Sequence, residues 1–235
     1  MADFAQFESI IGRAFRDKSL LEQAFTHRSY LNENRLPPQA GGPPREHNER
    51  LEFLGDAVLE LAVTEFLYGK YPEKPEGELT AFRAALVNTV SISDAAQKLG
   101  MNDYLLLSRG ESRDTGRARQ IILANAFEAL IGAIYLDAGY EGAKEFIASQ
   151  LFHKTDDVVE NRLWQDAKSR LQEVVQEKLR LTPAYQLLDQ SGPDHDRTFV
   201  VGVYLGNEKA ATGEGRSKQE AEQSAAEKAL QAKGW

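Results

Sequence analysis

Apolar residues recur every three or four positions through the first two thirds of the chain, which is the spacing of one helical face. In segment 48–72 this spacing predicts one long helix, with Gly69 and Pro72 marking its expected end. The same pattern predicts further helices over 19–31, 121–137 and 140–152, and one or two helices over 76–100. We therefore expect residues 4–139 to form an all-α domain whose helices continue to about residue 153.

Three segments before residue 165 lack this spacing. Segment 34–47 contains four of the eight prolines and two glycines, which predicts a loop or a flexible insertion. Segment 107–119 contains two glycines and four arginines (Arg109, Arg113, Arg117 and Arg119), and we interpret it as a second loop. Segment 153–164 has no strong pattern, and we interpret residues 154–164 as a linker.

The pattern changes after this linker. Segment 166–180 has helical spacing, whereas segment 197–205 alternates apolar residues onto one face, which is typical of a strand. Two further strands and a closing alanine-rich helix are predicted over 184–189, 208–215 and 217–232. The order α-β-β-β-α within residues 165–235 is typical of a small, compact α+β domain.

Composition narrows the class of protein. The chain has 235 residues, of which 42% are hydrophobic and 27% charged, as in soluble globular proteins. It contains no cysteine, which excludes disulfide bonds, cysteine zinc sites and thiol nucleophiles and fits a reducing compartment. The first residues lack the basic segment and apolar run of a signal peptide, and no apolar run reaches membrane-spanning length. We therefore expect a cytoplasmic protein with no membrane partner.

The charge is unevenly distributed. The chain carries a net charge of −8, which taken alone argues against a nucleic-acid partner. Residues 1–153 hold 16 basic and 22 acidic residues, whereas residues 162–235 hold 11 of each. Because the acidic surplus lies in the helical region, the α+β region and the arginines of segment 107–119 would have to attract a polyanion. A solvated turn is an equally good interpretation of those arginines.

Three acids in the long helix share one face. Glu49, Glu52 and Asp56 are spaced three and then four residues apart. A solvated face of an amphipathic helix explains such a pattern by itself. However, Gly55 stands in the middle of the helix, where glycine costs about 1 kcal/mol relative to alanine. Its presence indicates that something packs closely against the helix backbone at this point.

A fourth acid lies in a helix too apolar to be a solvated face. Glu128 and Asn125 are the polar pair of the stretch "IILANAFEALIGAIYLD", and no lysine or arginine lies within one turn of Glu128. If this helix packs on the long helix, Glu128 converges with Glu52 and Asp56. Clustered carboxylates share protons or hold a hard divalent cation, and oxygen ligands select Mg²⁺ or Mn²⁺. Magnesium held by carboxylates is typical of phosphodiester chemistry.

The closing helix has a recognisable start. Ser217 and Glu220 form an S-x-x-E capping box, which places Lys218 in the first turn. An exposed lysine tolerates that position at low cost. Alternatively, Lys218, Arg216 and the free N–H groups of the helix start together bind a phosphate, and the preceding glycines Gly213 and Gly215 allow a close approach of backbone.

Two sets of motifs resemble a known family. "THRSY" and "NERLEFLGDAVLEL" resemble the upstream motif and signature helix of the bacterial ribonuclease III family, and "ILANAFEALIGAIYLD" resembles its second acidic helix. "RLQEVVQEK" and "GEGRSKQEAEQSAAEKAL" resemble the first and last helices of a double-stranded RNA-binding domain. The resemblance covers nearly the whole chain in the family's domain order, so it is highly specific.

The resemblance implies an activity. The first domain would be an all-helical endonuclease domain that forms a homodimer, and the second would bind A-form duplex by its shape. The reaction would be magnesium-dependent hydrolysis of phosphodiester bonds in double-stranded RNA, with Mn²⁺ as a substitute, leaving 5′-phosphate and 3′-hydroxyl ends. The implied roles are ribosomal RNA processing and messenger RNA maturation or turnover.

Site residues follow from the resemblance where this sequence matches the family's motifs. Glu52, Asp56 and Glu128 match metal ligands, and Asp56 and Glu128 also match catalytic acids. Asn125 stands at the position of a further metal ligand, and Glu49 and Glu76 match acids near the cleavage valley. The residues that match RNA contacts of the second domain are Gln172, Glu173, His195, Arg216, Ser217 and Lys218.

The chain also departs from the family pattern. The family usually has aspartate where this chain has Asn125, and a second basic residue where it has Gln219. Segment 34–47 is longer than in compact members. An amide oxygen can bind a hard cation, but an amide is neutral and accepts no proton, so we expect weaker metal binding or slower chemistry. Asn125 is either a natural variant that the site tolerates or a deliberate inactivating change.

Three functions remain open at this point. The leading one is the endonuclease. A non-catalytic RNA-binding or scaffolding protein, with its nuclease site weakened at Asn125, is the alternative from another class. The retained acids favour the enzyme, because a decaying site would lose more than one group. A metal-dependent hydrolase of another phosphorylated substrate is the third, and the RNA-binding region argues against it.

Overall fold

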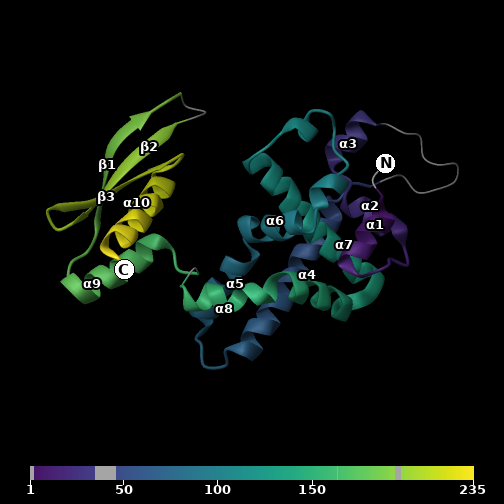
Figure 1. Cartoon of the computed structure of the whole chain (residues 1–235), viewed down its shortest axis with the longest axis horizontal. Coiled ribbons are helices and arrows are strands. Elements are labelled where there is room, and N and C mark those ends of the chain that lie inside the picture. Colours follow the sequence, from purple (N-terminus) through teal and green to yellow (C-terminus); the bar gives the residue numbers. More distant parts are fainter. Residues whose placement is uncertain (1–2, 35–45, 163, 194–196) are drawn as a thin grey trace. The chain divides into compact units, whose positions relative to one another are not determined.

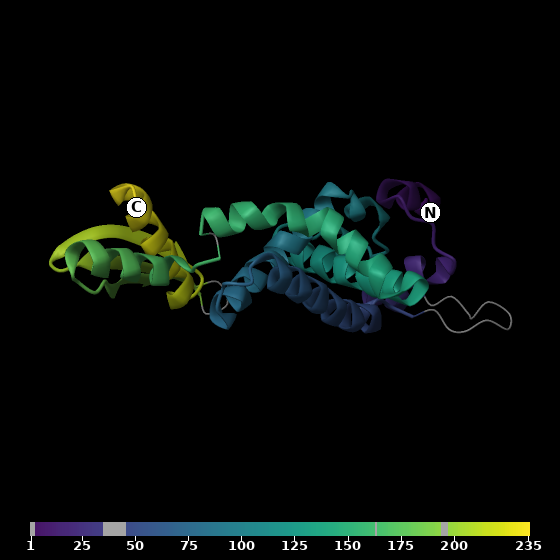
Figure 2. The same cartoon turned by 90° about the horizontal axis from the view of Figure 1, so that it is seen from below.

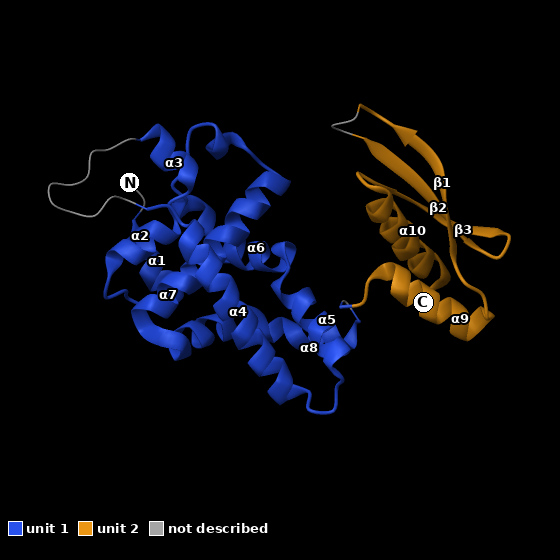
Figure 3. Cartoon of the chain, turned by 180° about the vertical axis from the view of Figure 1, so that it is seen from behind, with its two compact units in different colours: residues 1–164 blue, residues 165–235 orange. Residues whose placement is uncertain are grey.

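The computed structural model describes residues 3–34, 46–162, 164–193 and 197–235. The chain divides into two compact units, residues 1–164 and residues 165–235, which are coloured separately in Figure 3. We call them the helical unit and the α+β unit. Most of the proline-rich segment 34–47 lies outside the described residues.

The helical unit contains α-helices and short 3₁₀ turns and no strand within its described residues (Figure 1). Its helices are α1 Phe4–Ile11, α2 Lys18–Ala24, α3 Arg28–Glu33, α4 Glu49–Lys70, α5 Glu76–Val87, α6 Thr89–Lys98, α7 Arg117–Leu151 and α8 Thr155–Glu160. Its 3₁₀ turns are η1 Met101–Tyr104, η2 Glu111–Arg113 and η3 Phe152–Lys154.

Helices α4 and α7 form the centre of this unit and lie side by side in both views of the chain (Figures 1 and 2). Two glycines bring their backbones into contact. A Cβ atom placed on Gly55 would overlap the carbonyl oxygen of Glu128, and one placed on Gly132 would overlap the carbonyl oxygen of Leu51. The close approach expected at Gly55 is therefore made by helix α7. The surrounding core includes Phe7, Phe25, Phe82, Phe127, Leu59, Leu67, Leu86 and Leu130.

A backbone bridge and side-chain caps divide the predicted helices. The helix expected over 19–31 breaks between α2 and α3, because Thr26 pairs with Leu106 in an isolated parallel bridge and His27 caps α3. The region 76–100 forms two helices, separated by Asn88, whose side chain accepts a hydrogen bond from the Ser91 amide. The turn at Gly139 interrupts α7 with φ of 76°.

The arginine-rich segment is less loop-like than predicted. Arg117 and Arg119 belong to the first turn of α7, and Arg113 ends the turn η2. The Arg119 guanidinium donates hydrogen bonds to the carbonyl oxygens of Glu111, at 2.8 Å, and Asp114, at 3.2 Å. Arg119 therefore holds the turn η2 against α7. This structural role explains one of the four arginines without any contact to RNA.

The segment expected to be a linker carries structure of its own. Helix α8 buries Val158 and Thr155 against the helical unit, and the Trp164 ring packs edge-on against Phe82 with centroids 5.1 Å apart. Lys154 donates a hydrogen bond of 3.1 Å to the Ser91 carbonyl. These contacts come from residues distant in sequence, so the local pattern did not predict them.

The α+β unit has the predicted element order. It consists of α9 Ala167–Leu179, β1 Ala184–Ser191, β2 Thr198–Leu205, β3 Glu208–Gly215 and α10 Lys218–Lys233. The strands form an antiparallel sheet in the order β1-β2-β3, and α9 and α10 cover one face of it (Figure 1). Its core is small and includes Leu171, Val175, Val203, Leu205, Ala225, Ala226, Ala229 and Leu230.

Glycines serve close packing in this unit as well. A Cβ atom on Gly213 would overlap backbone atoms of α10 at Ala221 and Ala225, and one on Gly215 would lie 2.5 Å from the Ala221 amide nitrogen. The space over both glycines is filled by α10. The close backbone approach considered from the sequence is therefore between β3 and α10.

One helical run, Arg117–Glu160, is long and apolar enough by composition to cross a membrane. In the structure 61% of its apolar window is buried inside the protein, as in the core helix of a globular protein. The apolar character of α7 is explained by its central place between α2, α4 and α6.

Candidate active site and nucleic-acid interface

The crossing of α4 and α7 determines where the acids lie. Gly55 directly precedes Asp56 and follows Glu52 by three residues, and it touches the backbone of Glu128. Gly132 follows Glu128 by one helical turn and touches the backbone of Leu51. Because neither glycine leaves room for a side chain, Glu52 and Asp56 on one helix are brought beside Glu128 on the other.

Glu128 has the most strongly perturbed acid group of the site. Burial, followed by the negative charges of Asp56, Glu52 and Glu60, raises the pKa of the Glu128 carboxyl to about 8. Among the residues that the structure describes, no lysine, arginine or histidine forms an ion pair with Glu128, Glu52 or Asp56. The crossing therefore concentrates negative charge without compensating it.

The Glu52 carboxyl is affected by the same concentration of negative charge at the crossing. Burial and the charge of Glu49 raise the pKa of the Glu52 carboxyl, and Asp56 adds to this effect. The half-buried Asn125 side chain acts in the opposite direction, because its amide donates a hydrogen bond to Glu52 and lowers that pKa. Asn125 and Glu52 are thus neighbours across the crossing.

The residues at the crossing fit a divalent cation in charge and in donor chemistry. Glu52, Asp56 and Glu128 offer carboxylate oxygens and Asn125 offers an amide oxygen, and hard cations such as Mg²⁺ prefer oxygen ligands. The half-buried, uncompensated Glu128 carboxyl is the group that a cation would stabilise most. The described residues contain no group of three or more acidic or histidine side chains already gathered at coordination distance.

Helix α4 carries one more acid on this face than the sequence interpretation named. Glu60 follows Asp56 by four residues, so Glu49, Glu52, Asp56 and Glu60 form one line, which we call the acidic row. Glu49 lies 3.4 Å from Arg28, and Glu60 lies 2.7 Å from Arg83. The same spacing argument that selected Glu52 and Asp56 would have found Glu60.

Glu76 takes a separate position at the start of α5. The Thr80 hydroxyl donates a hydrogen bond of 3.0 Å to its carboxylate, and the side chain is exposed. Glu76 contributes to none of the charge interactions that raise the pKa values of Glu52 and Glu128. A single chain therefore does not bring Glu76 to the acidic row.

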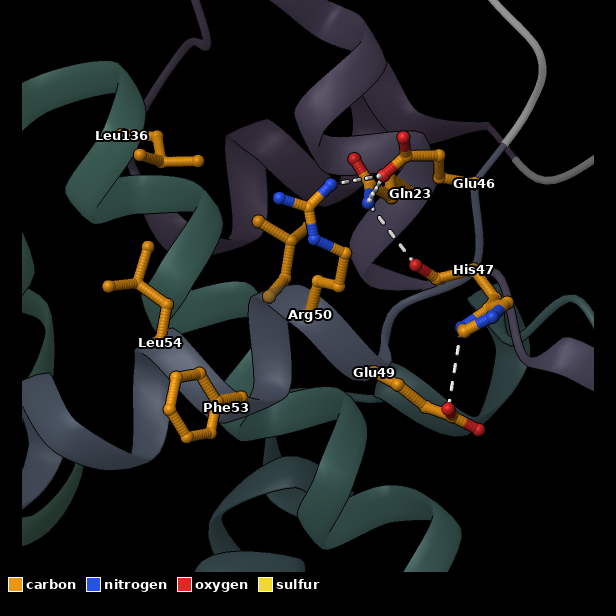
Figure 4. Close-up of a pocket in the computed structure, with 9 residues that line it drawn as sticks. Gln23, Glu46, His47, Glu49, Arg50, Phe53, Leu54 and Leu136 are labelled. Carbon is orange, nitrogen blue, oxygen red and sulfur yellow. Dashed lines mark hydrogen bonds and ion pairs between the residues drawn. The ribbon is translucent and has the colours of Figure 1, made fainter.

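A pocket of about 580 Å³ opens beside the N-terminal half of α4 (Figure 4). Its lining consists of Gln23, Glu46, His47, Glu49, Arg50, Leu51, Phe53, Leu54 and Leu136. The Phe53 ring is 82% exposed, and Leu136 from α7 is 54% exposed. An aromatic ring so exposed beside a pocket of suitable size marks this face as a candidate contact surface.

The candidate RNA contacts of the α+β unit are exposed. Gln172 and Glu173 lie on the outer face of α9, opposite the buried Leu171 and Val175. Glu173 accepts a hydrogen bond of 2.7 Å from Gln165. His195 lies outside the described residues.

The start of α10 has the predicted cap. The Ser217 hydroxyl accepts a hydrogen bond of 3.1 Å from the Glu220 amide, and the Glu220 carboxylate accepts one of 2.9 Å from the Arg216 amide. In the usual capping box the carboxylate would accept from the amide of the N-cap residue, Ser217. Here it accepts instead from the amide of Arg216, the residue before the N-cap. Lys218 is exposed in the first turn, where a basic side chain and free N–H groups face the same direction of approach.

Comparisons with known proteins agree with the division of the chain into a helical unit and an α+β unit. Residues 17–155 match the model of the family described as "Ribonuclease-III-like", and residues 167–233 match "Double-stranded RNA binding motif". The chain is 47% identical to Ribonuclease 3 of Bacillus licheniformis, over 97% of this chain and 88% of that protein. It is also 47% identical to Ribonuclease 3 of Enterococcus faecalis, over 93% of this chain and 92% of that protein.

A solved structure resembles the helical part. The nuclease domain of ribonuclease III from Campylobacter jejuni, described with a flexible region involved in dimer formation, superposes with a TM-score of 0.54 at 39% identity. The match covers 63% of this chain and 98% of that one. The acids at the crossing of α4 and α7 thus lie in the part of the chain that resembles a nuclease domain.

Proposed function

The chain belongs to the ribonuclease III family of double-stranded RNA endonucleases, and from that premise we propose that it hydrolyses phosphodiester bonds in duplex RNA with Mg²⁺. Mn²⁺ is the expected substitute. The products are 5′-phosphate and 3′-hydroxyl ends, and the setting is ribosomal RNA processing and messenger RNA maturation or turnover in the cytoplasm.

One observation carries the proposal. Glu128 is a half-buried carboxylate with a pKa raised to about 8, beside Asp56 and Glu52 and without a cation among the described residues. A protein keeps such a group at a cost in stability. A divalent cation relieves that cost, and strongly perturbed acids that lie together are typical of catalytic sites.

Each residue of the crossing has a role in this proposal. Glu52, Asp56 and Glu128 would hold the cation, and Asp56 and Glu128 would also accept hydrogen bonds from the attacking water and so orient it. Mg²⁺ held there would supply Lewis-acid chemistry, polarising the phosphate and lowering the pKa of a water. The protein supplies position and fixed charge and forms no covalent bond to the RNA.

Asn125 changes the balance of charge at the site. Its amide donates a hydrogen bond to Glu52 and lowers the pKa of that carboxyl. A fourth carboxylate at this position would instead repel Glu52. We propose that Asn125 orients Glu52 and offers a neutral ligand, so that the site binds its cation more weakly but keeps its activity.

The α+β unit supplies the attraction for RNA in this proposal. Gln172 and Glu173 on α9 contact the minor groove together with His195, and Arg216, Ser217 and Lys218 bind phosphates. The unit recognises the duplex by shape and 2′-hydroxyls, with little sequence dependence. This division of labour is supported by charge, since residues 162–235 carry none of the acidic surplus of the chain.

Two chains would complete the enzyme. Phe53 stands at the rim of the pocket beside α4 (Figure 4), and an isologous dimer would present each Phe53 to the pocket of its partner. Within one chain Glu76 lies apart from the acidic row. In a dimer this separation needs no further explanation, because Glu76 does not have to act on the acids of its own chain. Phe53→Asp should shift the full-length protein from dimer to monomer in light scattering, and a dimer that survives this change contradicts the arrangement.

The cleavage test compares three proteins on long duplex RNA, with Mg²⁺ and with EDTA. We expect the chain to cleave only with Mg²⁺, Glu128→Gln to lose activity by a factor of at least about 100 and Asn125→Asp to cleave faster. If only Asn125→Asp cleaves, the chain is a duplex RNA-binding protein without activity of its own. Equal cleavage by Glu128→Gln would remove the crossing from the mechanism.

A further inference from the structure

The acidic row is paired with arginine at its two ends and unpaired in its centre. Arg28 lies against Glu49 at one end, and Arg83 lies against Glu60 at the other. Glu52 and Asp56 between them have no cationic partner among the residues described. The local charge is therefore highest where α7 adds Glu128.

The two end pairs differ in strength. Arg28 and Glu49 are 3.4 Å apart, and their side chains are 67% and 47% exposed. Arg83 and Glu60 are 2.7 Å apart, and their side chains are 34% and 39% exposed. Short, partly buried arginine–carboxylate contacts are charge-assisted hydrogen bonds, whereas long exposed ones contribute little. The Arg83–Glu60 ion pair is therefore stronger than the Arg28–Glu49 ion pair.

Arg83 is held in place by both helices that it joins. It belongs to α5, where its neighbour Phe82 and the residue Leu86 are buried in the core. Its guanidinium also donates a hydrogen bond of 2.9 Å to the Thr64 hydroxyl of α4, which itself donates to the Glu60 carbonyl oxygen at 2.6 Å. The Arg83 guanidinium therefore contacts two side chains on one turn of α4, those of Glu60 and Thr64.

We propose that Arg83 is a positioning residue of the cleavage site, which acts through Glu60 and confines the divalent cation to Glu52, Asp56 and Glu128. Glu60 is close enough to Glu128 for their charges to interact, so an unpaired Glu60 would be a competing oxygen ligand one helical turn from Asp56. The ion pair with Arg83 neutralises Glu60 and occupies its oxygens. This inference rests on the proposed metal-dependent cleavage.

The proposal predicts an unusual combination of effects. Removing the arginine adds one uncompensated negative charge beside the site, so the cation should bind more tightly, by roughly threefold to tenfold for charges about one or two helical turns apart. Cleavage at saturating Mg²⁺ should nevertheless become slower, because Glu60 draws the cation from its productive place. An arginine that merely stabilised the fold would not tighten metal binding.

The test is a double-mutant cycle on the full-length protein, with Mn²⁺ binding measured by titration calorimetry and duplex RNA cleavage measured in parallel. Arg83→Met should lower the Kd for Mn²⁺ and reduce kcat by about tenfold, and Arg83→Met with Glu60→Gln should return both to within about twofold of wild type. Arg83→Lys keeps the charge and should leave the Kd unchanged. Lys98→Met, which removes an exposed pair with Asp94 on α6, is the matched control.

The outcomes separate this inference from the function on which it rests. An unchanged or weaker Mn²⁺ affinity in Arg83→Met, or a failure of Glu60→Gln to restore it, overturns the role of Arg83. Circular dichroism melts identify a variant that has lost its fold. Arg83→Gln, which also removes the charge but keeps a polar side chain beside Thr64, then replaces Arg83→Met with the same expected tightening of Mn²⁺ binding, and an unchanged Kd overturns the role of Arg83. A wild-type protein that binds Mn²⁺ but does not cut duplex RNA contradicts the proposed function, and the titration still tests Arg83. Absence of Mn²⁺ binding by the wild type overturns both.

Discussion

The α4–α7 crossing of the helical unit and the contact between α9 and α10 in the α+β unit treat their acidic groups in opposite ways. In the helical unit, burial and neighbouring acids raise the pKa values of Glu128 and Glu52. In the α+β unit, burial also acts on Asp166, but hydrogen bonds from Ser169 and Gln223 outweigh it and lower the pKa of that carboxyl. Glu222 is likewise paired with Lys168 at 2.6 Å. The α4–α7 crossing therefore concentrates uncompensated negative charge, whereas the contact between α9 and α10 pairs its acidic groups.

The two units resemble each other in how they bring functional residues into place. Each uses glycine to let two backbones touch, at Gly55 and Gly132 in one and at Gly213 and Gly215 in the other. In the helical unit this contact brings together acids from two helices. In the α+β unit it seats α10 on the sheet and so places its N-terminus. Both units thus pack two backbones closely at glycines. They differ in the side chains near the contact, which are acidic at the α4–α7 crossing.

The largest expected effect comes from filling the contact at Gly55. Gly55→Ala places a methyl group on the Glu128 carbonyl oxygen, so the helices must separate. We expect a cost of about 3 kcal/mol or more and a fall of about 10 °C in the Tm of the helical unit. The transition of the α+β unit should not move. Differential scanning calorimetry measures both.

Gly69→Ala is the matched control on the same helix. A Cβ atom at Gly69 meets nothing within 4 Å, so the helix should gain about 1 kcal/mol from the better helix former. Similar losses of Tm for the two variants would mean that glycine content, rather than the contact with α7, governs the stability of α4.

A smaller effect is expected from the equivalent change in the α+β unit. Gly213→Ala forces a methyl group into the backbone of α10 at Ala221 and Ala225. A cost of about 2 kcal/mol would lower the Tm of this small unit by about 10 °C and weaken duplex RNA binding, because the start of α10 moves. Metal binding by the helical unit should be unchanged, and a change there would show that the units do not work separately.

The charge at the crossing predicts a pH-dependent stability. The pKa of Glu128 is raised from 4.5 to about 8, so the folded protein retains a proton that the unfolded chain releases between these values. Stability without metal therefore falls as the pH rises from 4.5 to 8. Glu128→Gln cannot ionise, so in EDTA its Tm should match wild type near pH 4.5 and exceed it by about 4–8 °C at pH 8.5.

Metal should reverse this difference. At pH 8.5 in Mg²⁺ the wild type should regain stability, whereas Glu128→Gln should not respond. A Tm difference that stays constant from pH 4.5 to 8.5 would show that Glu128 is not an uncompensated charge.

The smallest expected effect concerns the α+β unit and salt. Duplex RNA binding should weaken as salt rises, because phosphate contacts release counterions. Lys218→Gln should reduce the slope of log K against log salt by about 1. Lys233→Gln, at the far end of α10 and paired with Glu208 at 3.1 Å, should leave the slope unchanged. Equal slopes for all three proteins would exclude Lys218 from phosphate contact.

Long periodic segments were the most predictable part of the fold. Helix α4 and the three strands followed from local spacing and turn residues, and Gly55 indicated the close contact before its partner was known. The break at Thr26 and the helix α8 did not, because they depend on residues distant in the chain.

The candidate site was predictable to a similar extent. The approach of Glu128 to Glu52 and Asp56 followed from helix spacing, whereas the contact between Asn125 and Glu52 was not predicted. The pairing of Glu60 with Arg83 could not be predicted, because its two members lie 23 residues apart on different helices and arginine has many possible partners at a surface. Glu76 remains an expectation, since its place depends on a second chain.

The central claim is that the acids at the α4–α7 crossing perform the chemistry while the α+β unit binds the RNA. The most direct test measures single-turnover cleavage and duplex RNA affinity for Asp56→Asn, an isosteric change at an exposed acid of the crossing. We predict RNA affinity within about twofold of wild type and cleavage reduced by a factor of at least about 100 at saturating Mg²⁺. Cleavage at the wild-type rate, or a loss of RNA affinity as large as the loss of cleavage, would contradict the account.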